Sequence, residues 1–256
     1  MALPEPPRRV VSLVPSLTEA VAVTAPDLLA GATDWCTHPP GLDLPRVGGS
    51  KYPSVAAVRA LRPDLVLANV EENRREDVAV LRTAGIPVWV TYPRTLPGAL
   101  DSLARMLGAL GCPSPPWLAE AAAAWAAPPP DPVRRAVVPV WRRPWVVLGP
   151  DTFAGDLLRR LGVHNLYGDD VGGDRYPRPP LAELRARRPD LVVLPDEPYA
   201  FTATDGPEAF PGVPCALVSG RHLTWYGPSL AQARAELAGQ LDPDAWVRAP
   251  NPTGQR

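Results

Sequence analysis

The sequence is poor in the residues that hold metals or build disulfide frameworks. Cysteine and histidine each occur only three times among 256 residues. The cysteines are odd in number, lie far apart and form no CxxC motif, and no two histidines stand at a ligand spacing. A zinc site and a disulfide framework are therefore not expected.

Strong charge and long apolar runs are also missing. The net charge is −1, which gives no electrostatic footprint for nucleic acid. No stretch reaches about 18 consecutive apolar residues, so we expect no insertion into a membrane. The N-terminus lacks a charged region followed by an apolar core, and the sequence as written therefore predicts a cytoplasmic protein. A misassigned start codon would instead allow export.

Motifs of common enzyme classes are absent as well. The sequence has no GxSxG elbow and no GxGxxG fingerprint, and the GGSK stretch that ends at Lys51 lacks the spacing of a P-loop. Lys51 is nevertheless the only lysine, beside 25 arginines. A point-charge contact to a phosphate or carboxylate of a ligand is one interpretation of Lys51, and chance is the other. We expect a protein that is not an enzyme.

What the sequence does contain is an internal repeat. Residues 59–68 (RALRPDLVLA) and 185–194 (RARRPDLVVL) match at seven of ten positions with an offset of 126. Glu71 and Glu197 follow at the same offset. A repeat of this length indicates two similar lobes rather than a solenoid, whose periods are 20–50 residues. Small ligands usually bind in the cleft between two such lobes.

The order of apolar runs and helix signals predicts the fold class. The first half reads as alternating strands and helices with continuously apolar strands, starting with a strand at 9–14, which favours parallel sheets. The second half repeats this order, starting with a strand at 145–149. We therefore predict an α/β protein with two Rossmann-like lobes, 8–113 and 134–245. The segment 114–133 is expected to be a connecting helix, or alternatively one more surface helix.

Aromatic residues beyond the predicted strand ends are candidates for ligand contacts. A large, flat, partly apolar ligand would suit such rings, and Arg221 could meet its polar periphery. The candidate rings are Tyr92, Tyr176, Trp225 and Tyr226.

Segments along nearly the whole chain resemble the class III periplasmic-binding-protein superfamily, and most closely its cobalamin receptors and helical backbone metal receptors. The residues that carry the resemblance are RVVSLVPSLTEAV (9–21), GATDWCTHPP (31–40), RVGG (46–49), LRPDLVLAN (61–69), GIPVWV (85–90), GPDTFAGDLLRRLGVHNLY (149–167), RPDLVVL (188–194) and WYGPSL (225–230). The resemblance implies two lobes joined by one long helix, with a corrinoid, haem or iron chelate bound in the cleft. It also implies that Glu71 (or Glu72) and Glu197 dock onto arginines of an ABC permease.

These observations together predict a non-enzymatic binding protein for cobalamin or a related metal chelate, with no intrinsic cofactor. The alternative is a cytoplasmic corrinoid-handling factor or enzyme on the same scaffold. A degenerate interaction protein without a ligand is a third possibility. For Glu71 and Glu197 we expect exposed carboxylates that serve a partner, although two solvated loop residues would look the same in the sequence.

Overall fold

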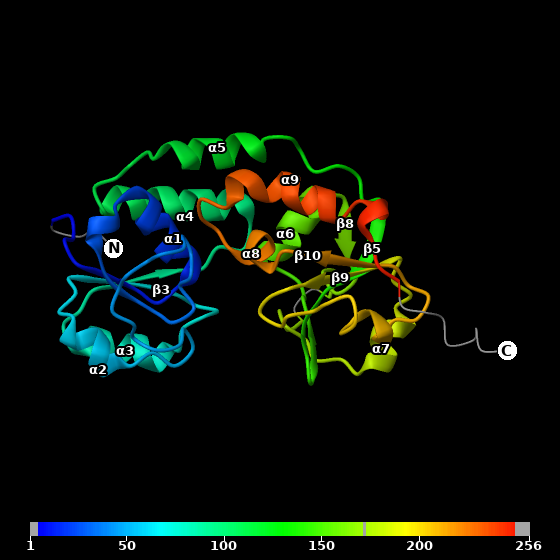
Figure 1. Cartoon of the computed structure of the whole chain (residues 1–256), viewed down its shortest axis with the longest axis horizontal. Helices are drawn as coiled ribbons and strands as arrows, with labels where there is room; N and C mark the ends of the chain where they lie inside the picture. The colour runs from blue at the N-terminus through cyan, green and yellow to red at the C-terminus, as the bar shows by residue number, and fades with distance from the viewer. Residues whose placement is uncertain (1–4, 171–172, 249–256) are drawn as a thin grey trace. The chain divides into compact units, whose positions relative to one another are not determined.

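The structure, a computed structural model, describes residues 5–170 and 173–248 and divides into two compact units (Figure 1). Unit 1 contains the described residues up to Pro93, together with Pro97–Ala123 and Tyr226–Pro228. Unit 2 contains Arg94–Leu96, Ala124–Trp225 and the described residues from Ser229 onward. Each unit thus holds a short segment from the other half of the chain.

Unit 1 is built on a four-stranded parallel sheet in the order β2-β1-β3-β4. Its core includes a cluster of buried aliphatic side chains such as Val11, Val66 and Leu81. The strands are β1 (Val10–Ser12), β2 (Leu29–Ala32), β3 (Leu65–Asn69) and β4 (Val88–Thr91). The helices of this half are α1 (Pro15–Thr24), a 3-10 turn (Pro26–Leu28), α2 (Val55–Ala60), α3 (Arg75–Thr83), α4 (Leu96–Ala109) and α5 (Pro116–Ala124).

Unit 2 contains a second four-stranded parallel sheet, in the order β10-β9-β5-β8. The strands β6 (Pro139–Arg142) and β7 (Trp145–Val147) form a separate antiparallel hairpin. The sheet strands are β5 (Arg134–Val137), β8 (Val163–Asn165), β9 (Leu191–Pro195) and β10 (Cys215–Val218). The helices are α6 (Phe153–Arg160), α7 (Leu181–Ala186), α8 (Gly220–Thr224), α9 (Leu230–Gln240) and two 3-10 turns (Pro207–Ala209 and Pro243–Ala245).

The two sheets have the same topology, which confirms the predicted fold class. The order β2-β1-β3-β4 of unit 1 becomes β8-β5-β9-β10 in unit 2 when the strands are matched in sequence order. One correspondence predicted from the sequence is wrong: the counterpart of the first strand is β5, whereas Trp145–Val147 lies in the hairpin. The apolar run at 145–149 looks like a buried strand, while β5 begins with two arginines and follows a proline-rich stretch.

The repeated Arg-Pro-Asp motif has the same structural role in both units. The Asp64 carboxylate accepts hydrogen bonds from the amides of Arg8 and Arg9, at 2.8 and 3.0 Å, just before β1. The Asp190 carboxylate accepts from the amide of Arg135, at 3.1 Å, in β5. Each aspartate therefore joins the start of its own strand to the start of the central strand beside it.

This difference between the two aspartates predicts different stability losses. Asp64→Ala removes two charge-assisted hydrogen bonds and should lower the free energy of unfolding by about 1–2 kcal/mol. Asp190→Ala removes one and should cost roughly half as much. Urea denaturation of both variants measures the difference, and a larger loss for Asp190→Ala would contradict this role for the motif.

The segment expected to connect two lobes lies mainly in unit 1. Helix α5 contributes all of its residues but Ala124 to that unit. The indole of Trp117 is buried, and its Nε1 donates to Oγ1 of Thr24 at 2.9 Å. The observed division therefore differs from the expected limits of 8–113, 114–133 and 134–245. In the described part of the chain no helix has both the length and the apolar character needed to cross a membrane.

Candidate functional site

Three large aromatic rings are exposed at the carboxyl edge of the unit 1 sheet. Trp35 lies in the loop after β2 and is 67% exposed, and Tyr92 directly follows β4 and is 40% exposed. Tyr52 is 72% exposed, in the loop 48–53. In parallel α/β sheets, the loops at the carboxyl ends of the strands are where ligands usually bind. We call Trp35, Tyr52 and Tyr92 the unit 1 aromatic edge.

The loop that carries Tyr52 is held at this edge by two sets of contacts. Gly48 and Pro53 form an isolated antiparallel bridge that closes the loop. The Lys51 ammonium donates to the carbonyl oxygen of Glu71 at 3.3 Å, beyond the end of β3. The Lys51 side chain therefore links this loop to the neighbouring strand end. A contact between Lys51 and an anionic group of a ligand stays a prediction.

Glu71 is half-buried, so the expectation of an exposed carboxylate at this position is wrong. Its amide donates to the Asn69 side-chain oxygen at 2.6 Å, while the Asn69 amide donates to the Asn73 side-chain oxygen at 2.8 Å. These hydrogen bonds fold the chain back on itself after β3, where the Glu71 carbonyl oxygen accepts from Lys51 of the loop 48–53. A partner-docking role for Glu71 stays a prediction.

Tyr226 comes from the far end of the chain but is buried in unit 1. Only 5% of the residue is exposed. Its hydroxyl contacts the Asn69 Nδ2 atom at 2.5 Å and the Thr91 Oγ1 atom at 2.9 Å, at the ends of β3 and β4. Burial, and next the charge of Glu72, raise the pKa of its phenol well above the ordinary value. These contacts give Tyr226 a structural role, and a contact with a ligand stays a prediction.

In unit 2, Glu197 follows β9 and is also half-buried, contrary to the expectation of an exposed carboxylate. Its side chain lies against the start of α8, since a Cβ atom on Gly220 would stand only 2.4 Å from the Glu197 Cγ atom. Burial raises the pKa of the Glu197 carboxyl, the neighbouring Asp196 raises it further, and a hydrogen bond from Trp225 and the charge of Arg221 oppose both effects.

The same contacts bring three predicted site residues together. Trp225 donates to Glu197, and the Arg221 guanidinium carbon lies 5.7 Å from the centre of the Trp225 ring. Arg221, Trp225 and Glu197 therefore form one half-buried cluster at the carboxyl ends of β9 and β10. Since Arg221 and Trp225 are only partly covered, they offer a cation and an aromatic ring at this edge. Their role in binding stays a prediction.

Tyr176 lies in a segment that runs beside the hairpin strand β7. The amides of Val147 and Gly149 donate to the carbonyls of Pro177 and Arg175, at 3.0 and 2.8 Å. Tyr176, between these two acceptors, is half-buried. The hydrogen bonds fix the backbone on either side of the ring, so that Tyr176 has a defined position in unit 2.

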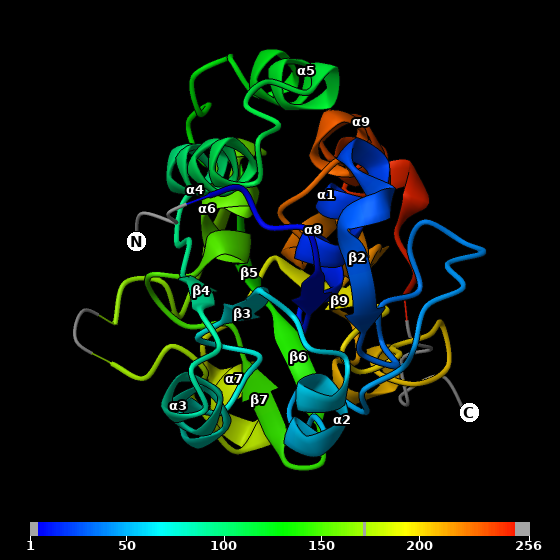
Figure 2. The same ribbon diagram turned by 90° about the vertical axis from the view of Figure 1, so that its left-hand side faces the viewer.

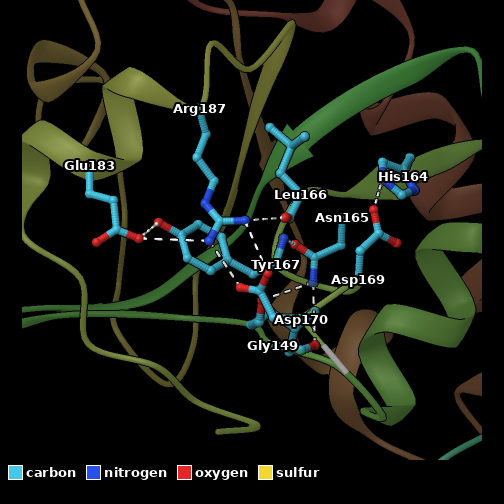
Figure 3. Close-up of polar contacts among 10 residues, drawn as sticks. Gly149, His164, Asn165, Leu166, Tyr167, Asp169, Asp170, Glu183 and Arg187 are labelled. Atoms are coloured by element: carbon cyan, nitrogen blue, oxygen red, sulfur yellow. Dashed lines mark hydrogen bonds and ion pairs between the residues drawn. The ribbon is translucent and has the colours of Figure 1, made fainter. Parts of the chain in front are cut away.

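The stretch that follows β8 is fixed by the side chain of Arg187 (Figure 3). Its guanidinium lies over the Tyr167 ring, 3.7 Å from the ring centre, and donates to the Leu166 carbonyl at 2.7 Å and to Asp170 at 2.9 Å. The Tyr167 hydroxyl donates to Glu183 at 3.0 Å. Burial, then Glu183, raise the pKa of Tyr167 to about 12. The network thus fixes the chain from Leu166 to Asp170.

Residues 5–170 and 173–248 hold no cluster of the usual metal-ligating side chains. Groups of three or more histidine, cysteine, aspartate or glutamate residues that could hold an ion do not occur among them.

No protein-family model matches the chain. Among curated proteins, a cobalamin-binding protein of Halobacterium salinarum is 31% identical over 206 residues, which are 75% of this chain and 55% of that protein. The matched regions span 38 to 55% of the length of the curated relatives, so the chain matches only about half of each relative's length or less.

Solved structures match over a greater length. The periplasmic vitamin B12-binding protein BtuF of Vibrio cholerae matches with a TM-score of 0.72 and 18% identity, over 93% of this chain and 98% of that chain. The chain has the class III periplasmic-binding fold. A second protein of this fold, the periplasmic haem-binding protein BhuT in complex with two haems, matches with a TM-score of 0.70 and 25% identity, over 91% and 97% of the two chains.

The comparisons overturn one expectation drawn from the sequence. The similar structures are of periplasmic proteins, so the prediction of a cytoplasmic protein is wrong, and the comparisons point to an exported one.

Two residues of the unit 1 aromatic edge were not singled out from the sequence as site residues. Trp35 and Tyr52 both lie in the proline- and glycine-rich stretch 34–53. Their positions, after β2 and next to the end of β3, depend on contacts of that stretch with residues distant in sequence, such as the Lys51–Glu71 hydrogen bond. An aromatic residue in a loop that follows a parallel strand is the signal that would have identified Trp35.

Proposed function

We propose that the protein binds cobalamin or a haem-like metal chelate and catalyses no reaction on it. The observation that carries the proposal is the unit 1 aromatic edge, where three exposed rings stand at the carboxyl ends of parallel strands. Exposed aromatic rings that are grouped in this way suit a flat macrocycle with a large apolar face. The fold and the ligands of the similar proteins agree with this class of ligand.

The proposed roles follow from the chemistry of each side chain. Trp35, Tyr52 and Tyr92 pack against the macrocycle from unit 1. From unit 2, Tyr176 and Trp225 add rings, and Arg221 pairs with a polar or anionic group at the edge of the ligand. Lys51 of unit 1 likewise pairs with a polar or anionic group of the ligand. The metal enters with the chelate, so no intrinsic cofactor is required.

We further propose that the protein is exported and delivers its ligand to an ABC permease. Glu71 and Glu197, which stand at equivalent positions of the two repeats, are the proposed docking residues. Both are half-buried, so each presents only part of its carboxylate to a partner.

Titration of the purified protein with cyanocobalamin and haemin, followed by absorbance, tests the binding proposal. One of the two should bind with micromolar affinity or better, about −8 kcal/mol. Tyr176→Ala and Tyr52→Ala should each weaken that binding by roughly 1–3 kcal/mol, because each removes a ring from the ligand face.

Val80→Ala is the matched control, since it shortens an exposed apolar side chain of α3. Its affinity should equal that of the wild type. If neither compound binds, the proposed function is refuted. Unchanged affinity of one tyrosine variant would remove that tyrosine from the site.

A further inference from the structure

The β6–β7 hairpin distinguishes unit 2 from unit 1. In unit 1, β1 ends at Ser12 and α1 begins at Pro15, so only residues 13 and 14 lie between them. In unit 2, β5 ends at Val137 and α6 begins at Phe153, which leaves residues 138–152 between them. Unit 1 forms the same strand order without a hairpin. The strand order of unit 1 shows that such a sheet does not need the hairpin, so its side chains are available for another role.

The hairpin extends from the carboxyl end of β5, the edge where loops of such sheets bind ligands. Only Val138 separates β5 from β6. Figure 2 shows β6 and β7 side by side, joined by a tight turn. The Trp141 ring of β6 meets the Tyr199 ring edge-on, with centroids 5.5 Å apart. Tyr199 lies in the loop after β9, so the hairpin packs on a second loop of the same edge.

The turn end of the hairpin is held firmly, through Arg142, the last residue of β6. Arg142 forms ion pairs with Asp205 and Glu208, and its guanidinium carbon lies 5.6 Å from the centre of the Trp145 ring. The Tyr199 hydroxyl donates to the same Asp205 at 2.7 Å. Because one arginine and two acids fix the hairpin to the loop after β9, the hairpin can present its remaining side chains at a defined position.

Two of these remaining side chains are accessible. Trp141 is 42% exposed. Arg143, at the turn, is exposed, and among the described residues its side chain makes no hydrogen bond or ion pair. The hairpin thus combines a partly exposed ring with a cation that no carboxylate of the described residues neutralises, whereas the adjacent Arg142 pairs with two acids. A guanidinium of this kind forms two parallel hydrogen bonds with a carboxylate, and an aromatic ring packs on a flat apolar face.

We propose that the β6–β7 hairpin recognises a planar metal chelate that carries carboxylates, with Trp141 packed on the macrocycle and Arg143 paired with a carboxylate at its rim. The inference rests on the proposed function and narrows its ligand class to anionic chelates. It adds to the binding residues two side chains on an element that unit 1 lacks.

Haemin and its dimethyl ester are the probes, because the ester keeps the macrocycle and iron but has no free carboxylate. The variants are Arg143→Gln and Trp141→Ala, and thermal unfolding checks that both remain folded. Arg143→Gln should weaken haemin binding about tenfold and leave binding of the ester unchanged. Trp141→Ala should weaken binding of both compounds. Arg59→Gln, which removes another exposed arginine without a side-chain partner from α2, should change neither.

Each other outcome overturns a defined part of the proposal. If wild-type protein binds haemin and both variants match it, the hairpin has no part in recognition, although the proposed function stands. If Arg143→Gln weakens the binding of haemin and of its ester equally, the pairing of Arg143 with a carboxylate is overturned. If the protein binds cyanocobalamin but not haemin, the restriction to anionic chelates is overturned and the proposed function stands. If it binds neither compound, the proposed function is overturned as well.

Discussion

Gly149→Ala is expected to destabilise the protein by about 2–4 kcal/mol and to weaken chelate binding at the same time. A Cβ atom on Gly149 would lie 2.4 Å from the Asp174 carbonyl oxygen and 2.9 Å from that of Arg175. Backbone atoms cannot rotate away as a flexible side chain can, so the segment beside β7 must shift. The shift would break the hydrogen bond from the Gly149 amide to the Arg175 carbonyl. Overpacking and the lost bond together account for the expected loss.

The coupling to binding follows from the place of Tyr176 in the same segment. If Tyr176 packs on the ligand, a displaced backbone costs affinity even though no binding side chain has been changed. Urea denaturation measures the stability, and absorbance titration of the folded variant measures the affinity.

Gly239→Ala provides the matched control in the same unit. Gly239 lies inside α9, and a Cβ atom there would meet nothing within 4 Å. Alanine should therefore stabilise the protein by about 0.5–1 kcal/mol, because it restricts the unfolded chain and favours the helix. A Gly149→Ala variant as stable as wild type would show that the segment moves without cost. Normal affinity in a destabilised variant would separate Tyr176 from the site.

The repeat made much of the fold predictable from the sequence. A motif such as Arg-Pro-Asp survives in both halves because its aspartate accepts backbone hydrogen bonds that each sheet needs. The apolar runs at 65–69 and 191–195 are buried along their whole length, which is why their pattern identified them as parallel strands.

The candidate site was harder to predict, because its geometry depends on contacts between residues far apart in sequence. Tyr226 looked like an exposed ring beyond a strand end, but its hydroxyl reaches Asn69, 157 positions away. Glu197 looked like a solvated loop residue, yet the absence of a Cβ atom on Gly220 lets its side chain lie against α8. No local pattern encodes either contact. The hairpin was missed for a different reason: its apolar strand resembles a strand of the parallel sheet.

The carboxylate of Asp156 is buried in unit 2, and its removal is expected to cause a second large loss of stability. Asp156 is 9% exposed and accepts a hydrogen bond from the Leu96 amide at 2.8 Å. It also pairs with Arg159 at 2.6 Å and Arg160 at 2.9 Å. Leu96 belongs to Arg94–Leu96, the short segment that the first half of the chain contributes to unit 2. Asp156 therefore binds this segment to α6, and Arg94 of the same segment also pairs with Asp151, just before that helix.

Asp156→Ala is expected to lower the free energy of unfolding by about 3–5 kcal/mol, because it leaves the Leu96 amide and a partly buried arginine without their acceptor. Asp156→Asn should cost less, since the amide oxygen can still accept from Leu96. Asp169→Ala is the control: that carboxylate is 72% exposed and pairs only with His164 among the described residues, so its loss should cost about 0.5 kcal/mol or less. Urea denaturation near neutral pH compares the three.

The pH dependence gives a second, independent test of Asp156. Burial alone would raise the pKa of its carboxyl, but the hydrogen bond from Leu96 and the pairs with Arg160 and Arg159 outweigh burial and hold the pKa below the ordinary value. A depressed pKa in the folded state means that the stabilisation is present above the unfolded pKa of about 4 and is lost as the pH falls below it. Wild-type stability should therefore decline more steeply below about pH 4 than that of Asp156→Asn, which has no proton to take up. Parallel declines for the two proteins would show that the ionised carboxylate does not hold Arg94–Leu96 in unit 2.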